Sequence, residues 1–254
     1  MISDIVDKWI SSKNNSALLL SKKIRYTYLM KHIVNKFDKK KLASLSRVVF
    51  EGKIVVVLSE YVAEQAVNYL LSQSILGIDT ETRPSFTKGK QYKVALLQVS
   101  THDTCFLFRL NHLGDSPSIK RFLEDKTVPK IGLSLNDDIH ALSKRMEFQK
   151  GWFIDLQDIM NEIGIADMSL AKLYANLFGR RISKREQLSN WEADILSVKQ
   201  QKYAATDAWA CIQIFEEYLR LKETQDYELE IVPEVVAPIQ TTVSENHHVQ
   251  DDRT

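Results

Sequence analysis

The chain has 254 residues, of which 44% are apolar and 26% are charged, and its net charge is +1. This size supports one well-buried domain and excludes two large ones. The two cysteines, Cys105 and Cys211, are far apart and lack metal-ligand spacing, which argues against a zinc site or disulfide framework and favours a reducing compartment. No apolar run approaches the roughly 20 residues of a membrane span, and the patch at residues 17–20 lacks signal-peptide features. We therefore expect a cytoplasmic protein without membrane contact.

Charge is distributed unevenly along the chain. Residues 1–48 contain eleven lysines and arginines against three acids, whereas residues 222–254 contain two against eight. The sequence predicts a basic N-terminal extension at residues 1–48, either disordered or helical, a folded domain at residues 49–221, and an acidic disordered tail at residues 222–254. The extension either contacts phosphates or is a solvated arm, and translation starts at Met1 or at Met30.

Strand and helix patterns alternate between these two ends. The first strand is rich in β-branched residues, and Ser59 can cap the helix that follows it. The expected strands are residues 53–58, 75–78, 94–99, 104–108, 129–133 and 152–154, of which the third and fourth form an antiparallel hairpin. The expected helices run from about Ser59 to Leu70, Ser116 to Glu124, Asp137 to Met146, Leu170 to Leu177 and Ser197 to Leu221, with a loop over residues 180–196. This order indicates an α/β domain with a mixed sheet.

Two acids, Asp79 and Glu81, follow the apolar strand at residues 75–78. Residues two apart on a strand point to the same face, so both carboxylates project together at the end of the strand, where ligand sites of open α/β sheets tend to lie. Neighbouring carboxylates repel each other unless a cation neutralises them, and Mg²⁺ prefers carboxylate oxygens together with water and phosphate. The alternative is a strand-end turn that carries two solvated acids.

A third acid, Asp207, lies one helical turn after Tyr203, so the two side chains share a helix face. The alanines between them allow the helix to approach the sheet closely. An acid among apolar neighbours is costly to bury without a partner, and a metal ion held jointly with Asp79 would be such a partner. The alternative is an exposed acid on a half-buried helix.

A fourth acid is expected where a short strand enters a helix, at Asp137 or Asp138. Acids are favoured at helix N-termini by capping and by the helix dipole, so their presence there needs no functional reason. The residues alone do not choose between the two. Together, the acids and the tyrosine are the parts needed to hold two metal ions and to orient a water for attack on a phosphodiester.

These patterns resemble the three exonuclease motifs of the DEDDy 3′–5′ exonuclease superfamily, in order and over roughly residues 50–221. The flanking segments at residues 93–98, 189–191 and 203–208 resemble the Werner-type branch most. The resemblance implies a ribonuclease H-like fold, with a mixed five-stranded sheet flanked by helices. Counted from Gly132, its spacing places the metal-binding acid at Asp138.

The same resemblance implies the roles of the site residues. Asp79, Glu81 and Asp207 would hold a metal that activates water, Asp79 would bridge to a second metal, and Asp138 would act mainly through the water shell. Tyr203 would orient the attacking water. The implied cofactors are two divalent cations, Mg²⁺ or Mn²⁺, and the implied products are nucleoside 5′-monophosphates released from the free 3′ end of DNA or RNA, single-stranded or frayed. No obligatory protein partner is expected.

Substrate contacts are expected at Thr80 and in the loop after the acid pair, at Arg83, Lys88, Lys90 and Lys93. A solvated basic loop is the alternative. We expect no helicase, polymerase or HRDC-type helical module beside this domain, and therefore nothing that delivers a particular substrate unless the basic extension does so.

Two other protein classes share part of this pattern. Haloacid dehalogenase-like phosphatases also have an apolar strand that ends in Asp-x-acid, but here Glu81 replaces their acid/base aspartate and Arg83 replaces their Thr or Val. A non-enzymatic nucleic-acid-binding module is the second alternative, and the presence of all four acids and Tyr203 argues against it. No motif reports contacts to a 2′-hydroxyl, so the sequence does not distinguish DNA from RNA.

Overall fold

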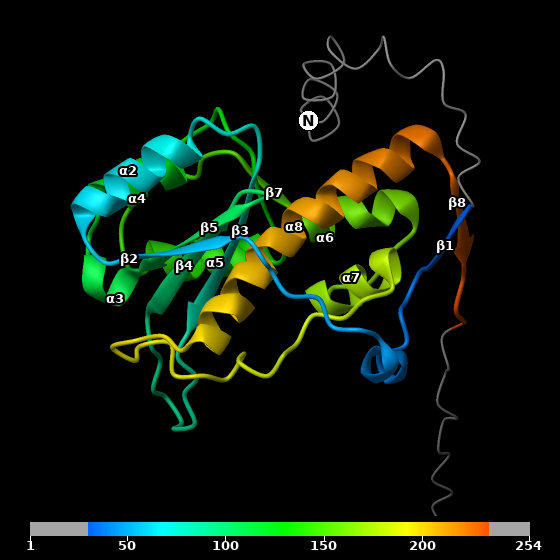
Figure 1. Cartoon of the computed structure of the whole chain (residues 1–254), viewed down its shortest axis with the longest axis horizontal. Helices are drawn as coiled ribbons and strands as arrows, with labels where there is room; N and C mark the ends of the chain where they lie inside the picture. Colours follow the sequence, from blue (N-terminus) through cyan, green and yellow to red (C-terminus); the bar gives the residue numbers. More distant parts are fainter. Residues whose placement is uncertain (1–29, 234–254) are drawn as a thin grey trace, which may run out of the picture.

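The computed structural model describes residues 30–233 (Figure 1). Residues 1–29 and 234–254 lie outside the described residues, and with them most of the expected basic extension, the apolar patch at residues 17–20 and most of the expected acidic tail.

The domain is built on a six-stranded mixed sheet, in the order β2-β5-β4-β3-β6-β7. Strands β3, β4 and β5 are antiparallel neighbours, and the other pairs are parallel. The strands are β2 (Lys53–Val57), β3 (Leu76–Thr82), β4 (Val94–Ser100), β5 (Thr104–Arg109), β6 (Lys130–Gly132) and β7 (Phe153–Asp155). The α/β class with a mixed sheet is confirmed, and each of the six predicted apolar runs forms a strand. The five strands implied by the resemblance are one too few, because the short β7 extends the sheet beyond β6.

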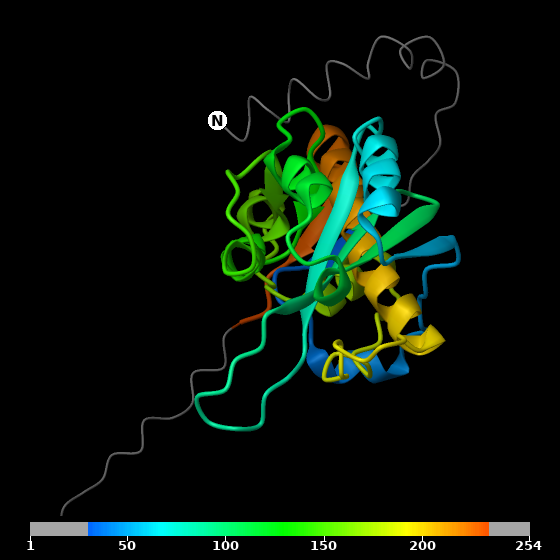
Figure 2. The ribbon, with the colours of Figure 1, turned by 90° about the vertical axis from the view of Figure 1, so that its left-hand side faces the viewer.

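Helices cover both faces of this sheet (Figures 1 and 2). On β5, Phe106 and Phe108 pack with the helices of one face, whereas Cys105 and Leu107 pack beside the helix of the other, as the two-residue period of a strand requires. The first face carries α2 (Glu60–Leu70), α4 (Pro117–Glu124) and α5 (Leu135–Ser143), with the short α3 (Leu110–Leu113) nearby. The second face carries α6 (Leu156–Met160), η2 (Asn161–Ile163), α7 (Leu170–Phe178) and α8 (Val198–Thr224).

Helix α8 is the longest helix of the described chain and crosses the second face of the sheet. The predicted capping box is present, because the Ser197 side chain accepts from the Gln200 amide and the Gln200 side chain accepts from the Ser197 amide, at 3.2 and 3.0 Å. The predicted loop at residues 180–196 contains no helix or strand, apart from an isolated bridge at Arg181.

The two ends of the described chain form a separate two-stranded parallel sheet, between β1 (Lys31–Val34) and β8 (Tyr227–Glu230). Ile33 of β1 is fully buried in the cluster formed with α6, α7 and α8, and the short helix η1 (Lys39–Ser44) follows. In the described part of each, the structure thus has paired strands where the sequence predicted a disordered or helical extension and a disordered tail. The strands are almost 200 residues apart in sequence, so local periodicity does not reveal their pairing. Among the described residues, no helix has both the length and the apolar character needed to cross a membrane.

Candidate active site

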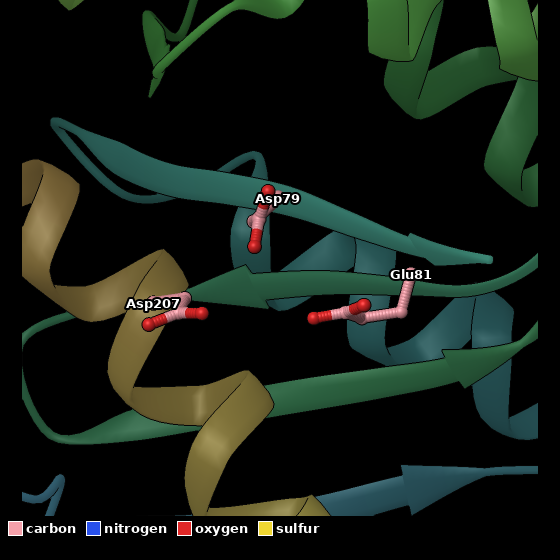
Figure 3. Close-up of side chains that lie close together, drawn as sticks. All are labelled: Asp79, Glu81 and Asp207. Carbon is pink, nitrogen blue, oxygen red and sulfur yellow. The ribbon is translucent and has the colours of Figure 1, made fainter. Parts of the chain in front are cut away.

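Three carboxylates converge between β3 and α8 (Figure 3). Asp79 and Glu81 project from β3 and Asp207 projects from α8, and each offers an oxygen within 4.8 Å of the other two. Glu81 and Asp207 are buried, with 8% and 6% of their surfaces exposed, whereas Asp79 is half-buried. Strand β3 continues through the acids to Thr82 instead of ending before them, so the two-residue period directs both carboxylates toward α8.

Small residues bring α8 close enough to share this site with β3. A Cβ atom on Gly77 would lie 1.9 Å from the carbonyl oxygen of Ala208, so this position of β3 tolerates no side chain. On α8, Ala204, Ala205 and Ala208 are fully buried against the sheet. The close approach places Asp207, the neighbour of Ala208, opposite Asp79.

Gln98 fixes the orientation of the Asp79 carboxylate. It lies opposite Asp79 in the β3–β4 register, is fully buried, and donates from Nε2 to Asp79 Oδ2 at 3.2 Å. The sequence analysis noted Gln98 only within a flanking segment. A buried amide on the strand next to an acid is the signal that identifies it.

Asp138 approaches β3 from the first face. It lies in the first turn of α5 and accepts a hydrogen bond from the Thr80 hydroxyl. The sequence predicted a substrate contact at Thr80. In the structure the Thr80 hydroxyl donates its hydrogen bond to Asp138, and the residue also lines the cavity described below. Asp137 is exposed, and the structure brings Asp138 rather than Asp137 to β3.

The start of α5 is held by a residue that the sequence analysis did not identify. Ser134, just before the helix, has a left-handed backbone with φ of 60°, and the Asp155 carboxylate at the end of β7 accepts from the amides of Ser134 and Leu135, at 3.0 and 2.7 Å. An acid beside unpaired helix amides satisfies donors that the helix itself cannot. Asp155 thereby positions the turn that carries Asp138.

Tyr203 lines the same cavity as the three carboxylates, and its ring lies 6.0 Å from that of Trp191. The segment that carries Trp191 is anchored by Arg109, a fully buried side chain that donates to the carbonyls of Ala193 and Asp194. Burial raises the pKa of the Tyr203 phenol, and the negative charges of Asp207 and Glu81 raise it further. At neutral pH the phenol is therefore protonated and can donate a hydrogen bond.

The carboxylates hold protons more tightly than free acids do. Burial, followed by the charges of Asp79 and Asp207, raises the pKa of Glu81 to about 10. Burial and the charges of Asp138 and Asp207 raise the pKa of Asp79 well above its usual value. Burial raises the pKa of Asp207 to about 7, against the opposing effects of the Tyr203 phenol and the Lys184 charge. Burial also raises the pKa of Asp138 to about 6.

This arrangement fits a divalent cation. The Oδ1 atom of Asp207 is buried and has no hydrogen-bond partner among the described residues, which is costly unless a cation supplies the missing interaction. The three converging groups offer only carboxylate oxygens, the ligand type that Mg²⁺ and Mn²⁺ prefer. A cation would also relieve the repulsion that raises the pKa values of these acids.

The acids open into a cavity of about 280 Å³. Its other lining residues include residues 168–171 and, from the predicted loop, Ser183, Lys184 and Gln187. Lys184 is the one lysine or arginine among the described residues that line this cavity, and its amine lies 3.5 Å from the Ser169 hydroxyl. The sequence analysis did not identify Lys184, because an irregular segment has no periodicity to predict where its side chains point.

The cations expected to contact substrate lie apart from the acids. Arg83 donates to Glu192 at 3.3 Å and lies over the Tyr92 ring, 4.8 Å from its centroid, and Lys90 lies 4.9 Å from the same ring. Lys88 and Lys93 are exposed, and none of these four side chains lines the cavity.

Comparison with known proteins identifies the family of the domain. Residues 54–222, about two thirds of the chain, match the model of the 3′–5′ exonuclease family. The mouse bifunctional 3′-5′ exonuclease/ATP-dependent helicase WRN is 29% identical over 170 residues, which cover 65% of this chain and 12% of that protein. The Drosophila melanogaster exonuclease 3′-5′ domain-containing protein 2 is 32% identical over 166 residues, which cover 64% of this chain and 28% of that protein.

A solved structure agrees with this match. The exonuclease domain of Nibbler from Aedes aegypti superposes with a TM-score of 0.62 at 21% identity, over 69% of this chain and 91% of that domain. The ribonuclease H-like fold implied by the sequence is thereby confirmed. The chain belongs to the 3′–5′ exonuclease family. It spans only a small part, about an eighth to a quarter, of the two curated relatives named above.

Proposed function

We propose that the protein is a divalent-cation-dependent 3′–5′ exonuclease that removes nucleoside 5′-monophosphates from the 3′ end of a nucleic acid. The observation that carries this proposal is the convergence of Asp79, Glu81 and Asp207 within 4.8 Å, in a cavity that also contains Tyr203. Family membership supports the reaction class.

The acids divide into ligands and positioning groups. Asp79, Glu81 and Asp207 would hold one cation, and Asp79 together with Asp138 would face a second. When bound, such cations lower the pKa of water and offset negative charge on a departing 3′-oxygen. Gln98 keeps the Asp79 carboxylate in one orientation, and Thr80 does the same for Asp138.

Two further side chains act on the substrate. The protonated Tyr203 phenol would orient the attacking water, a role supported by its position one helical turn from Asp207 in the same cavity. Lys184 supplies a positive charge opposite the carboxylates and would contact a phosphate oxygen of the terminal nucleotide. Unstacking a terminal nucleotide costs less than opening the interior of a duplex, which favours single-stranded or frayed 3′ ends.

The test is the shortening of 5′-labelled DNA and RNA oligonucleotides by the full chain with Mg²⁺ or Mn²⁺. We expect a ladder that shortens from the 3′ end, release of nucleoside 5′-monophosphates, and a block by a 3′-phosphate. Asp79→Asn should abolish the activity, whereas the matched variant Asp137→Asn, at an exposed acid, should retain it. A native protein inert on both nucleic acids with both metals would refute the proposal and favour a binding module.

A further inference from the structure

The described part of the N-terminal extension is docked beside the cavity wall. The amide of Val48 donates to the Arg181 carbonyl at 3.0 Å, and the amide of Arg181 donates to the Ser46 carbonyl at 2.9 Å. Side chains add to this contact, because Arg181 Nε donates to the Leu45 carbonyl and an Arg180 amino group donates to the Arg47 carbonyl. Figures 1 and 2 show the chain that follows η1 running beside the segment that follows α7. The extension is therefore fixed in place here.

These two segments together carry a cluster of positive charge. Residues 36–47 and residues 180–185 together contain a single acid, Asp38. Its carboxylate caps η1 by accepting a hydrogen bond from the Lys40 amide at 2.9 Å. Seven of the cations are exposed and Arg181 is half-buried, and none of these eight forms a salt bridge with a described carboxylate. We call this set the N-terminal basic surface; it consists of Lys39, Lys40, Lys41, Arg47, Arg180, Arg181, Lys184 and Arg185.

The N-terminal basic surface begins at the cavity itself. Ile182, Ser183 and Lys184 line the cavity, and Arg181, which pairs with the extension, is three residues before Lys184. Three residues of extended chain span about 10 Å. Positive charge thus runs outward from the carboxylate site, across the contact at Arg181, to η1.

The chemistry of this surface selects its partner. Phosphodiester backbones carry regularly spaced negative charge, and lysine and arginine side chains bind them by displacing counterions. A membrane-binding surface would need apolar side chains to insert beside its cations. None of the exposed large apolar residues of the described chain falls within residues 36–47 or 180–185, so a nucleic-acid strand fits better than a lipid surface.

We infer that the N-terminal basic surface binds the phosphate backbone of the strand whose 3′ end occupies the cavity. This inference rests on the proposed function, and it assigns a role to residues 39–47, which precede the segment matched by the family model. The surface holds the nucleotides upstream of the scissile bond, so long strands are preferred over dinucleotides.

The test compares two triple variants of the full chain that lose the same charge. Lys39→Gln/Lys40→Gln/Lys41→Gln removes exposed cations of η1, and Lys120→Gln/Lys126→Gln/Lys150→Gln removes exposed cations elsewhere on the domain. Kinetics are measured on a single strand of about 20 nucleotides and on a dinucleotide, and binding of the strand is measured by fluorescence anisotropy in Ca²⁺ over a range of salt concentrations.

For the η1 variant, we expect the KM and Kd for the long strand to rise about 10- to 100-fold near 0.1 M salt, with kcat and dinucleotide hydrolysis unchanged. The slope of log affinity against log salt should fall by roughly 2, since each contact to a single strand contributes about 0.7. The control variant should match the native protein in every readout, and equal melting temperatures would exclude misfolding.

Equal Kd values and salt slopes for the two triple variants would overturn the inference. So would loss of binding to phosphatidylserine vesicles, without loss of oligonucleotide binding, in the η1 variant. If the native protein hydrolysed neither substrate, the proposed function would be refuted instead. The anisotropy measurement would still show whether η1 binds the strand.

Discussion

The acids of β3 and the cations of the loop that follows are neighbours in sequence but differ in their surroundings. Asp79 and Glu81 face another acid inside a cavity, without a described positive partner within salt-bridge distance. Arg83, two residues after Glu81, already pairs with Glu192 and covers Tyr92. Clustered carboxyl groups without a positively charged partner are typical of a site that binds a cation, whereas an acid or base paired at the surface stabilises local structure.

The largest effect is expected at the buried acids. Glu81→Gln should lower kcat/KM by about 10³-fold or more, because it removes one member of a group that acts as a unit. The same substitution should raise the melting temperature of the metal-free protein, since it removes a carboxyl group whose ionised form is disfavoured by burial and by the neighbouring acids. Kinetics with Mn²⁺ and melting in EDTA measure both, with Asp137→Asn as the control. A Glu81→Gln variant with native activity would contradict the proposed difference between the acids of β3 and the cations of the loop that follows.

A smaller loss is expected for the phenol. Tyr203→Phe keeps the ring contact with Trp191 but removes the hydroxyl, so kcat should fall about 100-fold while Mn²⁺ affinity and stability stay near native. Rates at saturating metal and a metal titration separate these effects. Unchanged kcat would show that the hydroxyl has no part in the reaction.

Gln98 should act on metal affinity more than on the chemical step. Gln98→Met removes the hydrogen bond to Asp79 at similar volume, and loss of such a supporting contact typically weakens metal binding about 10- to 100-fold. We expect the Mn²⁺ concentration for half-maximal rate to rise by that factor, with kcat restored at high Mn²⁺. A lower kcat at every Mn²⁺ concentration would contradict this role.

Stability without metal should depend on pH in a defined direction. The pKa of Asp207 is about 7 and that of Glu81 about 10 in the folded protein, above their unfolded values, so the folded state binds more protons. The contribution of these two groups to the free energy of unfolding is fully present below about pH 4, and it is lost as the pH rises toward their folded pKa values. In EDTA, the melting temperature of the native protein should therefore fall relative to that of Asp207→Asn between about pH 4 and 7 and level off above pH 7. A constant difference between the two would contradict the raised pKa of Asp207.

The smallest effect is expected at the loop. Arg83→Gln breaks a partly exposed ion pair and a contact with Tyr92, interactions that are each worth about 1 kcal/mol or less. Exonuclease activity should change less than about threefold, and the melting temperature should fall slightly. A loss comparable to that of Glu81→Gln would place Arg83 at the substrate and erase the difference between the two regions.

Local sequence patterns predicted much of the fold and site. The two-residue period placed Asp79 and Glu81 on one face, the helical period placed Tyr203 beside Asp207, and the capping box marked the start of α8 at Ser197. Each of these features depends on residues a few positions apart, which is the range over which periodicity and capping are readable.

The remaining features depend on contacts between distant segments. The β1–β8 pair, the cap that Asp155 provides for α5, and the position of Lys184 in the cavity wall join parts of the chain with no shared local pattern. The choice of Asp138 over Asp137 needed a family resemblance, because both acids suit the first turn of a helix equally well. Gly77 appeared only as part of an apolar run, although the nearby Ala208 carbonyl requires a glycine there.

The most direct test compares the 3′-end shortening of one labelled oligonucleotide by the native protein, Asp207→Asn and Arg83→Gln, with Mn²⁺ and with EDTA. If the acids bind the cation, the native protein and Arg83→Gln should release nucleoside 5′-monophosphates with Mn²⁺ but not with EDTA. Asp207→Asn should release none under either condition. Release by Asp207→Asn at the native rate, or release that persists in EDTA, would contradict a cation-dependent site at Asp79, Glu81 and Asp207.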